Sequence, residues 1–276
     1  FRLYDLPDPD ITFSPYIPWS EAVPAQFQRQ HGYDLMPALP LLFADDTERG
    51  KAVRADFWET LSSMFRESYG ETYAAFCRRA GTAYSGHFLY EETFSIHPYM
   101  HGDILEQLGT MDIPGCDMLY ASPKKIFEFA AAIKFAASAA QLYGKTDVMI
   151  EASNICRDIF PITKSALMLA TALETALGVT RFTSYYTEFC MAEDDVRACC
   201  DFTEHLLSSL DGMEPIRTVY VYVPNRKYRE ECYPADSVSK KKPLSDALRR
   251  TDDFMTHCTG VLCRAGIDFH FISDAV

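Results

Sequence analysis

Two glutamates follow short apolar segments and form a candidate acid–base pair. Residues 85–92 end in Glu91 and Glu92, and residues 147–151 end in Glu151. Hydrolysis of a glycosidic bond uses two carboxyl groups, one as a proton donor and the other as a base or nucleophile. We therefore predict that Glu91 and Glu151 are catalytic residues. The alternative for each is a charged residue that marks the point where a strand reaches the surface.

A histidine shares the first segment with these carboxyl groups. Side chains alternate between the two faces of a strand, so His87 and Glu91 are predicted to lie on one face. In α/β barrels, catalytic groups come from the carboxyl ends of the strands. Asn154 follows Glu151 closely, and Tyr186 closes a later strand. We predict that His87 orients the acid or donates to a hydroxyl group. Asn154 and Tyr186 either bind substrate hydroxyl groups or are ordinary polar loop residues.

Helices and strands alternate along most of the chain. Apolar spacing and capping residues predict helices over residues 20–31, 47–80, 122–143, 162–177, 193–210 and 243–265. Apolar runs predict strands that end at Asp5, Glu91, Asp117, Glu151 and Tyr186. Such alternation is typical of parallel β/α units, and short crossovers place successive strands side by side. We therefore expect these strands to be parallel neighbours in one sheet.

The strand–helix pattern restarts after a polar segment in the last third of the chain. Residues 217–224 are predicted to form a strand, followed by a loop up to Pro243, and residues 267–272 form the last predicted strand. We therefore predict two domains, residues 1–211 and residues 212–276.

The composition excludes several classes of protein. A net charge of −13 and a pI near 4.9 argue against nucleic-acid binding, and no apolar run approaches the length of a membrane span. Nine cysteines without metal-binding spacing indicate free thiols in a reducing compartment, which favours the cytoplasm. The chain starts with Phe1 instead of methionine, so we expect the native protein to be longer.

One pair of histidines has the spacing of a metal site on a helix. His97 and His101 are four residues apart, which on a helix places both on one face. Pro98 and the lack of a glutamate after the first histidine weigh against a zinc site. We therefore predict that neither histidine binds a metal ion. The hypothesis weighed against zinc binding is that both histidines lie at the surface or at the rim of a pocket. The sequence leaves the oligomeric state open.

Several short motifs occur in a defined order along the chain. They are Asp5-Leu6-Pro7, Ile17-Pro18-Trp19-Ser20, Gly32-Tyr33-Asp34-Leu35, Gly86-His87 with Glu91-Glu92, Asp112-Ile113-Pro114-Gly115 with Asp117, Ser138-Ala139-Ala140 with Gly144-Lys145, and Glu151. Through the order and spacing of these motifs, the chain resembles the α-L-rhamnosidase-like group of large bacterial glycoside hydrolases over nearly its whole length.

This resemblance implies a fold and an activity. The catalytic domain of the group is an eight-stranded (β/α) barrel of the TIM type. The strand before Asp5 would be its fourth strand, and its fifth to eighth strands would end at Glu91, Asp117, Glu151 and Tyr186. The segment after the barrel resembles the start of a Rossmann-like α/β domain. The implied substrate is a glycoside such as an α-L-rhamnoside, and calcium is an implied cofactor for which no ligands can be assigned.

The resemblance also implies site residues and reveals two departures. The substrate-binding residues would be Asp5, His87, Glu92, Asp117, Asn154, Tyr185 and Tyr186. Leu6 stands where related sequences carry a proton-donating glutamate, and Tyr185 stands where they often carry a histidine. Either the acid role has moved to Glu91 or Glu92, or the protein is a carbohydrate-binding pseudoenzyme. A third hypothesis, a structural barrel module, predicts that Glu91 and Glu151 diverge.

Overall fold

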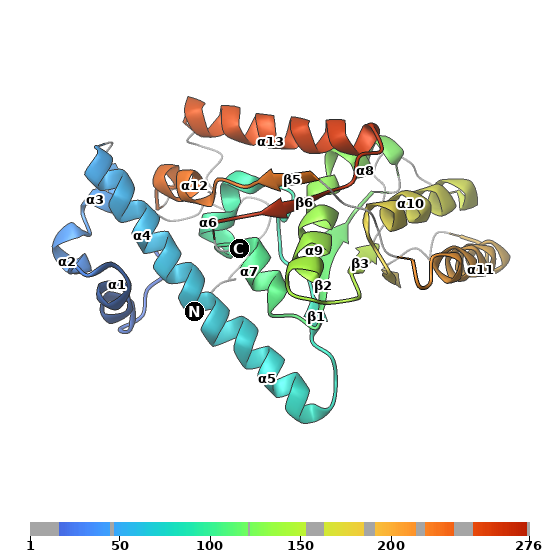
Figure 1. Ribbon diagram of the computed structural model, residues 1–276, viewed down its shortest axis with the longest axis horizontal. Coiled ribbons are helices and arrows are strands. Elements are labelled where there is room, and N and C mark those ends of the chain that lie inside the picture. The colour runs from blue at the N-terminus through green and yellow to red at the C-terminus, as the bar shows by residue number, and fades with distance from the viewer. Residues whose placement is uncertain are drawn as a thin grey trace.

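The computed structural model describes residues 17–44, 47–120, 122–152, 163–184, 191–213, 219–234 and 245–274. Figure 1 shows a parallel sheet flanked by helices, an N-terminal group of helices beside it, and a smaller sheet formed by the C-terminal segment. The predicted strand that ends at Asp5 lies outside the described residues.

Four short strands form one parallel sheet. They are β1 (Ser85–Gly86), β2 (Ile113–Met118), β3 (Met149–Ala152) and β4 (Arg181–Ser184). They pair in the order β1-β2-β3-β4, and each pair is parallel. This confirms the parallel neighbour order predicted for the last four strands of this series. The sheet is curled, as in half of a barrel.

Helices pack around the sheet and extend beyond it. The N-terminal helices are α1 (Val23–His31), α2 (Leu35–Ala38), α3 (Leu41–Ala44), α4 (Glu48–Phe65) and α5 (Glu71–Ala80). Those that follow β1 are α6 (His97–Met100), α7 (Ile104–Gly109), α8 (Pro123–Glu128) and α9 (Ala130–Leu142). The later ones are α10 (Lys164–Leu177), α11 (Glu193–Ser209), α12 (Asn225–Glu231) and α13 (Asp246–Arg264).

The long helix predicted over residues 47–80 is present, with a π-helical turn in its middle. Thr47 caps its first turn by accepting a backbone N–H through Oγ1. The π turn, η1 (Arg66–Gly70), joins α4 to α5. A Cβ atom at Gly70 would lie 2.6 Å from Oγ1 of Thr110. Glycine therefore lets the helix pass directly against the residues that lead into β2.

The two faces of the parallel sheet differ in what covers them. Cys116 and Ile150 are buried on the outer face, where α9 packs against β2. Met149 and Glu151 alternate with Ile150 along β3, so they face the inner side. A cavity of about 700 Å³ lies at β4 and is lined in part by α10 and α11. This cavity lies between the edge strand β4 and the two helices.

Helix α9 is a buried layer between two sheets. Its alanine-rich sequence is buried from Ala130 to Ala140. It contacts β2 and α7, and it also contacts β6 (Phe269–Ile272). Phe135 of α9 stacks on Phe271 of β6 with the ring centroids 4.3 Å apart. Because alanine side chains are small, both sheets can approach the helix closely and share one hydrophobic core.

The C-terminal segment forms a sheet of its own. β5 (Val219–Tyr222) pairs in parallel with β6, and α13 lies between the two strands in sequence. The predicted loop from residue 224 to Pro243 is wrong in its first part, where α12 forms. α12 is mostly polar, so its sequence has no apolar stripe that would predict a helix. Its stability comes instead from tertiary contacts with α4, where Trp58 Nε1 donates to the carbonyl oxygen of Cys232 at 2.6 Å.

The carboxylate of Asp103 connects the C-terminal segment to the rest of the molecule. Oδ1 accepts the backbone N–H of Leu105 at 3.0 Å and caps α7. Oδ2 accepts from Nδ2 of Asn225 and from Oγ of Ser273, both at 2.7 Å. Asp103 is buried, so these bonds offset the cost of removing its charge from water.

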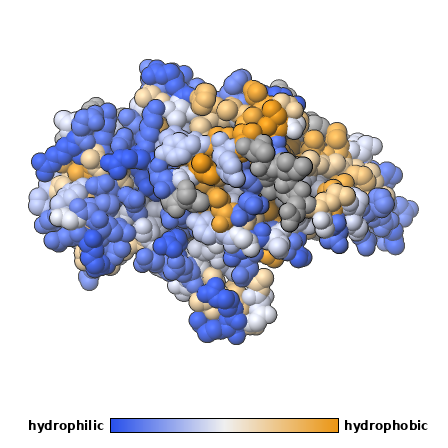
Figure 2. Space-filling view, in the orientation of Figure 1, coloured by the Kyte–Doolittle hydropathy of each residue, from blue (hydrophilic) through white to orange (hydrophobic). Residues whose placement is uncertain are grey.

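Apolar side chains are unevenly spread over the surface. Figure 2 shows mainly hydrophilic residues over α1–α4, whereas hydrophobic residues gather over the β5–β6 sheet and the helices beside it. Phe254 and Val261 of α13 and Tyr220 of β5 are among the exposed apolar or aromatic residues. Among the described residues, no helix combines the length and the apolar character needed to cross a lipid bilayer.

Lys134 allows a test of the contact between α9 and the C-terminal segment. Its buried Nζ donates to Oδ1 of Asp268 at 2.6 Å and to the carbonyl oxygen of Leu177 at 3.3 Å. Because removal of one partner leaves the other charge uncompensated, Lys134→Ala is expected to lower the free energy of unfolding by about 3 kcal/mol. Urea denaturation followed by circular dichroism measures this. The double variant Lys134→Met with Asp268→Asn should recover most of the loss. Unchanged stability of Lys134→Ala would contradict the assigned role.

Candidate active site

The first strand is shorter than its sequence indicates. β1 ends at Gly86, and residues 89–92 form a turn. The prediction that strand alternation places His87 and Glu91 on one face is therefore wrong. The chain turns because Oε1 of Glu91 accepts the backbone N–H of Phe88 at 2.8 Å. This local bond closes the turn. It takes the place of the hydrogen bonds to the neighbouring strand that would extend β1.

The turn nevertheless brings three predicted site residues together. Nε2 of His87 lies 3.2 Å from Oε2 of Glu151, near the end of β3. Nδ1 of the same ring lies 3.7 Å from Oε1 of Glu91 and 3.2 Å from the carbonyl oxygen of Phe88. Both ring nitrogens therefore face oxygen acceptors. The imidazole stands between two carboxyl groups, within hydrogen-bond distance of Glu151 and 3.7 Å from Glu91.

Glu91 is held firmly and is only 2% exposed. Its Oε2 accepts the backbone N–H of Asp117 at 3.2 Å, and its carbonyl oxygen accepts from Nε2 of His97 at 2.9 Å. Burial raises the pKa of Glu91 well above its usual value, and the nearby charges of Glu92 and Asp117 act in the same direction. The two backbone N–H donors act in the opposite direction. The protonated form therefore persists to higher pH than in an exposed glutamate.

Glu92 and Asp117 are two further carboxyl groups near Glu91. Glu92 is partly buried, and burial raises its pKa, with a further contribution from the charge of Asp117. Asp117 lies opposite Glu151 in the β2–β3 register, and Thr183 lies opposite Glu151 on the other side. Three polar side chains thus form a row across adjacent strands, next to carboxyl groups with raised pKa values. Such a combination is typical of catalytic sites.

The family of the chain follows from its sequence. The profile of glycoside hydrolase family 106, alpha-L-rhamnosidase, matches residues 15–187, which is more than half of the chain. The chain belongs to glycoside hydrolase family 106. No curated protein matches it.

A solved structure supports the fold of this family 106 chain. The chain is similar to the rhamnosidase from Novosphingobium sp. PP1Y, with 19% sequence identity and a TM-score of 0.56. The match covers 92% of this chain and 24% of that one. The family 106 chain thus spans about a quarter of the length of that structure. At this identity the similarity demonstrates a shared fold.

The two histidines considered for zinc are core residues of the family 106 chain. Both His97 and His101 are buried, and their ring centroids are 4.9 Å apart. Burial lowers the pKa of His97 to about 4, and it lowers the pKa of His101 well below the usual value, with a contribution from His97. Nε2 of His97 is already bonded to the carbonyl oxygen of Glu91. These rings therefore serve packing and the support of Glu91.

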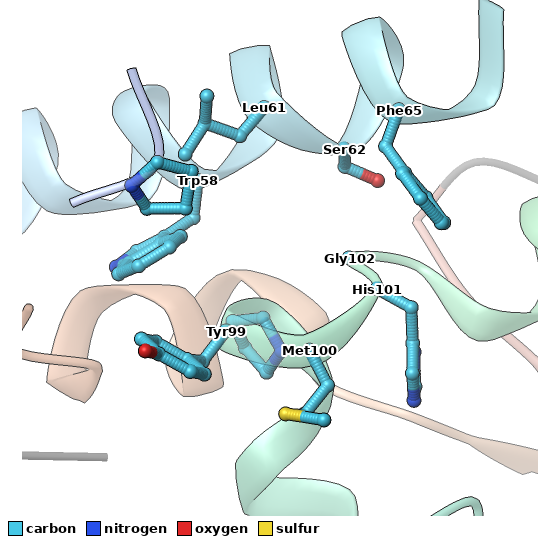
Figure 3. Close-up of a pocket in the computed structure, with 10 residues that line it drawn as sticks. Trp58, Leu61, Ser62, Phe65, Tyr99, Met100, His101 and Gly102 are labelled. Atoms are coloured by element: carbon cyan, nitrogen blue, oxygen red, sulfur yellow. The ribbon is translucent and has the colours of Figure 1, made fainter. Parts of the chain in front are cut away.

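A small pocket lies between α4 and the histidine segment. Figure 3 shows Trp58 and Leu61 on one side and Tyr99 on the other, with the ring of His101 pointing away from α4. The cavity has a volume of about 30 Å³, which is room for about one or two water molecules. This pocket is too small for a sugar.

The calcium implied by the resemblance does not fit the ligand groups that the structure describes. Among the described residues, three side chains place potential ligand atoms within 4.8 Å of one another, namely His31, Asp56 and Glu59. Arg226 lies 3.9 Å from Asp56, and Arg229 lies 3.7 Å from Glu59. Calcium prefers six to eight oxygen ligands. A cluster with one imidazole and two arginine neighbours does not match that preference.

Some predicted site residues of the family 106 chain lie outside the described residues. They are Asp5, Asn154, Tyr185 and Tyr186, and Leu6 lies outside them as well. The structure thus places His87, Glu91, Glu92, Asp117 and Glu151 in one region.

Sequence reasoning missed the support that α13 gives to the site. Asp252 accepts the backbone N–H of Ser95 at 2.9 Å and its hydroxyl at 3.0 Å. These bonds fix η2 (Phe94–Ile96), which follows the turn that carries Glu91. Ser95 and Asp252 are 157 residues apart. No local pattern could have connected them.

A second buried carboxyl group lies away from the site. Glu174 of α10 is fully buried, and neither of its carboxyl oxygens has a hydrogen-bond partner among the described residues. Burial raises the pKa of Glu174 to about 8. Because no partner compensates an ionised form, this group links the stability of the chain to pH.

Proposed function

We propose that the protein containing this chain hydrolyses a glycoside, with an α-L-rhamnoside as the first candidate. The observation that carries the proposal is the imidazole of His87 between the carboxyl groups of Glu151 and Glu91. These groups lie where β1 and β3 end, and carboxyl ends of strands carry the active sites of β/α barrels. Membership of family 106 supports the substrate class.

The proposal includes the predicted domain organisation. β1 to β4 correspond to the fifth to eighth strands of a (β/α) barrel, within a domain of residues 1–211. Residues 212–276 begin a Rossmann-like α/β domain. The curled parallel sheet supports the first part. The separate parallel pair β5–β6, with α13 as the crossover helix, supports the second.

Glu151 is assigned the role of general base. Its side chain is 30% exposed, so a water molecule can reach it. The bond to His87 orients the carboxylate and leaves its other oxygen for the substrate side. A base must contact the proton that it removes directly or through one water, and Glu151 on the inner face meets that condition.

The proton donor is assigned to Glu92 in preference to Glu91. Both have raised pKa values caused by burial, which keeps a carboxyl group protonated when it must act as an acid. Glu91, however, is almost completely enclosed, and backbone N–H groups occupy both of its carboxyl oxygens. Glu92 retains partial exposure and can reach a ligand. In this assignment Glu91 positions His87 and the turn.

The arrangement favours inversion at the anomeric carbon. Glu151 and Glu91 contact opposite nitrogens of one imidazole, so the ring and both contacts separate their carboxyl groups. Inverting glycosidases hold their two carboxyl groups about 6.5–9.5 Å apart, whereas retaining enzymes hold them about 5–5.5 Å apart. The imidazole itself fills the space between Glu91 and Glu151. We therefore place the attacking water on the exposed side of Glu151, in the gap between it and the assigned donor Glu92.

A direct assay tests the proposed function. The full-length protein is incubated with aryl and alkyl α-L-rhamnosides and with a panel of other glycosides. Release of the sugar is followed by chromatography, and the first anomer formed is identified by proton NMR. We expect hydrolysis with inversion. Turnover with retention would refute the geometric argument, and failure to hydrolyse any glycoside in the panel would refute the activity.

A carbohydrate-binding pseudoenzyme is the second candidate. Leu6 favours it, because leucine cannot donate the proton that related sequences supply at this position. This candidate predicts sugar binding without turnover by the full-length protein. The shared contact of His87 with Glu91 and Glu151 argues against the third hypothesis, a purely structural module, in which these carboxyl groups diverge.

The role of Glu92 has its own test. Glu92→Gln is expected to reduce kcat for alkyl glycosides by about 10²-fold or more. Aryl glycosides with acidic leaving groups should be far less affected, because such groups leave without protonation. An acid works only while protonated, so activity of the parent falls as pH rises through the raised pKa of the donor. This fall of activity at alkaline pH should be absent from the pH profile of Glu92→Gln.

Glu91→Gln serves as the comparison for this prediction. Glutamine keeps the size of the Glu91 side chain. The pH profile of Glu91→Gln should therefore show the same fall of activity at alkaline pH as the parent. If this fall is lost in Glu91→Gln and kept in Glu92→Gln, the assignment of the two glutamates must be exchanged.

A further inference from the structure

Tyr90 has an unusual backbone conformation for its residue type. Its φ angle is +61°, and it is the one non-glycine residue with positive φ among the described residues. In this left-handed region the Cβ atom approaches the carbonyl oxygen, at a cost of roughly 1–2 kcal/mol for a residue with a bulky side chain. Glycine or asparagine would occupy the position more easily.

The surrounding hydrogen bonds hold Tyr90 in this conformation. On one side, the backbone N–H of Phe88 donates to the carboxylate of Glu91. On the other, the backbone N–H of Thr93 donates to the carbonyl oxygen of Tyr90 at 3.1 Å. The second oxygen of Glu91 accepts from Asp117 of β2. The turn is therefore fixed across the carboxyl ends of β1 and β2.

Packing does not explain why this position carries an aromatic residue. Tyr90 is exposed, with 46% of its surface accessible to solvent. Its neighbour Phe88, by contrast, is partly buried and contacts Phe65 and His101 with ring centroids 6.1 and 5.4 Å away. A strained residue that gains little from burial points to a role outside the fold, since such strain persists mainly at functional sites.

The position of Tyr90 suggests what its ring contacts. It directly precedes Glu91 and Glu92 and lies three residues after His87. An exposed aromatic ring presents a flat apolar face with a polar edge. A pyranose ring has a matching apolar face made of C–H groups. We propose that Tyr90 is a carbohydrate-binding residue whose ring stacks on a sugar of the substrate at the rim of the site. This inference rests on the proposed function.

The test uses two substitutions that differ in what they remove. Tyr90→Asn deletes the ring and is compatible with positive φ, whereas Tyr90→Phe keeps the ring and deletes the hydroxyl group. KM and kcat are measured for the full-length protein with an aryl α-L-rhamnoside, and the midpoint of thermal unfolding is measured in parallel. We expect Tyr90→Asn to raise KM by about tenfold with kcat little changed, and Tyr90→Phe to stay within about threefold of the parent.

Thermal unfolding separates a binding role from a structural one. If the ring serves the substrate, Tyr90→Asn unfolds at the same temperature as the parent or higher, because the strain is relieved. If the ring serves the fold, Tyr90→Asn unfolds at a lower temperature. Phe76→Ala, which removes an exposed aromatic ring on α5, is the matched control and should leave KM unchanged. A folded Tyr90→Asn with the KM of the parent would overturn the proposal.

Failure of the proposed function is recognised separately in the unmodified protein. If the parent binds the rhamnoside without turnover, the dissociation constant from titration calorimetry replaces KM, and the same tenfold weakening is expected. If the parent neither binds nor hydrolyses any glycoside of the panel, both the function and the role of Tyr90 are refuted. An active parent with an unaffected Tyr90→Asn refutes the role of Tyr90 alone.

Discussion

Glu151→Gln is expected to lower kcat of the full-length protein by about 10²-fold or more, the loss that follows removal of a general base. Glutamine preserves the shape of the side chain and can still accept a hydrogen bond from His87. Sugar binding should therefore remain close to that of the parent. The measurement combines steady-state hydrolysis of an α-L-rhamnoside with titration calorimetry of the same ligand on the inactive variant.

Asp147→Asn is a suitable control for this prediction. Asp147 precedes the opposite end of β3, where it bonds to Arg181 and Thr180. Like Glu151→Gln, the substitution Asp147→Asn converts a carboxyl group of this segment to an amide. It does so away from the carboxyl end of the sheet. We expect kcat to stay near that of the parent. A loss of only a few-fold in Glu151→Gln, or equal losses in the two variants, would remove Glu151 from the base role.

Glu174→Gln is expected to stabilise the chain at alkaline pH. The pKa of Glu174 is about 8 in the folded state and about 4.3 in an unfolded chain. Between these values the folded state binds the proton more tightly, so the stability of the parent falls as pH rises, by about 1.4 kcal/mol per pH unit. The total is at most about 5 kcal/mol and levels off above pH 8. Glutamine removes this dependence.

Urea unfolding at several pH values measures the effect. Near pH 4 the carboxyl group is protonated in both states, so Glu174→Gln and the parent should have similar free energies of unfolding. Near pH 8.5 the variant should be more stable by several kcal/mol, on the order of 3. Glu204→Gln changes an exposed glutamate on α11 and should show neither effect. A constant difference between Glu174→Gln and the parent at all pH values would contradict the prediction.

The sequence predicted the features that depend on local pattern. Alternating apolar segments and helices were enough to predict the parallel order of β1 to β4. Because parallel strands end at the same edge, the same pattern brought Glu91 and Glu151 into one region. The helical periodicity of residues 47–80 also gave the correct outer bounds of α4 and α5.

Features set by contacts between distant residues could not be predicted. β1 ends early because Glu91 folds back on Phe88 and is also held by Asp117, 26 residues later. Helix α12 has no apolar stripe and depends on α4, as the bond from Trp58 to Cys232 shows. The left-handed conformation of Tyr90 runs against the preference of its own residue type. At α12, and at Glu91 through its bond with Asp117, contacts with distant residues override the local signal.

The bonds of Asp103 have a consequence for synthesis of the chain. Its partners Asn225 and Ser273 are 122 and 170 residues further along. At translation rates of about 5–20 residues per second, Asn225 leaves the ribosome roughly 6 to 24 seconds after Asp103. Until then the carboxylate can cap α7 but cannot complete its buried network. Closure of this buried junction therefore waits for β6 and Ser273.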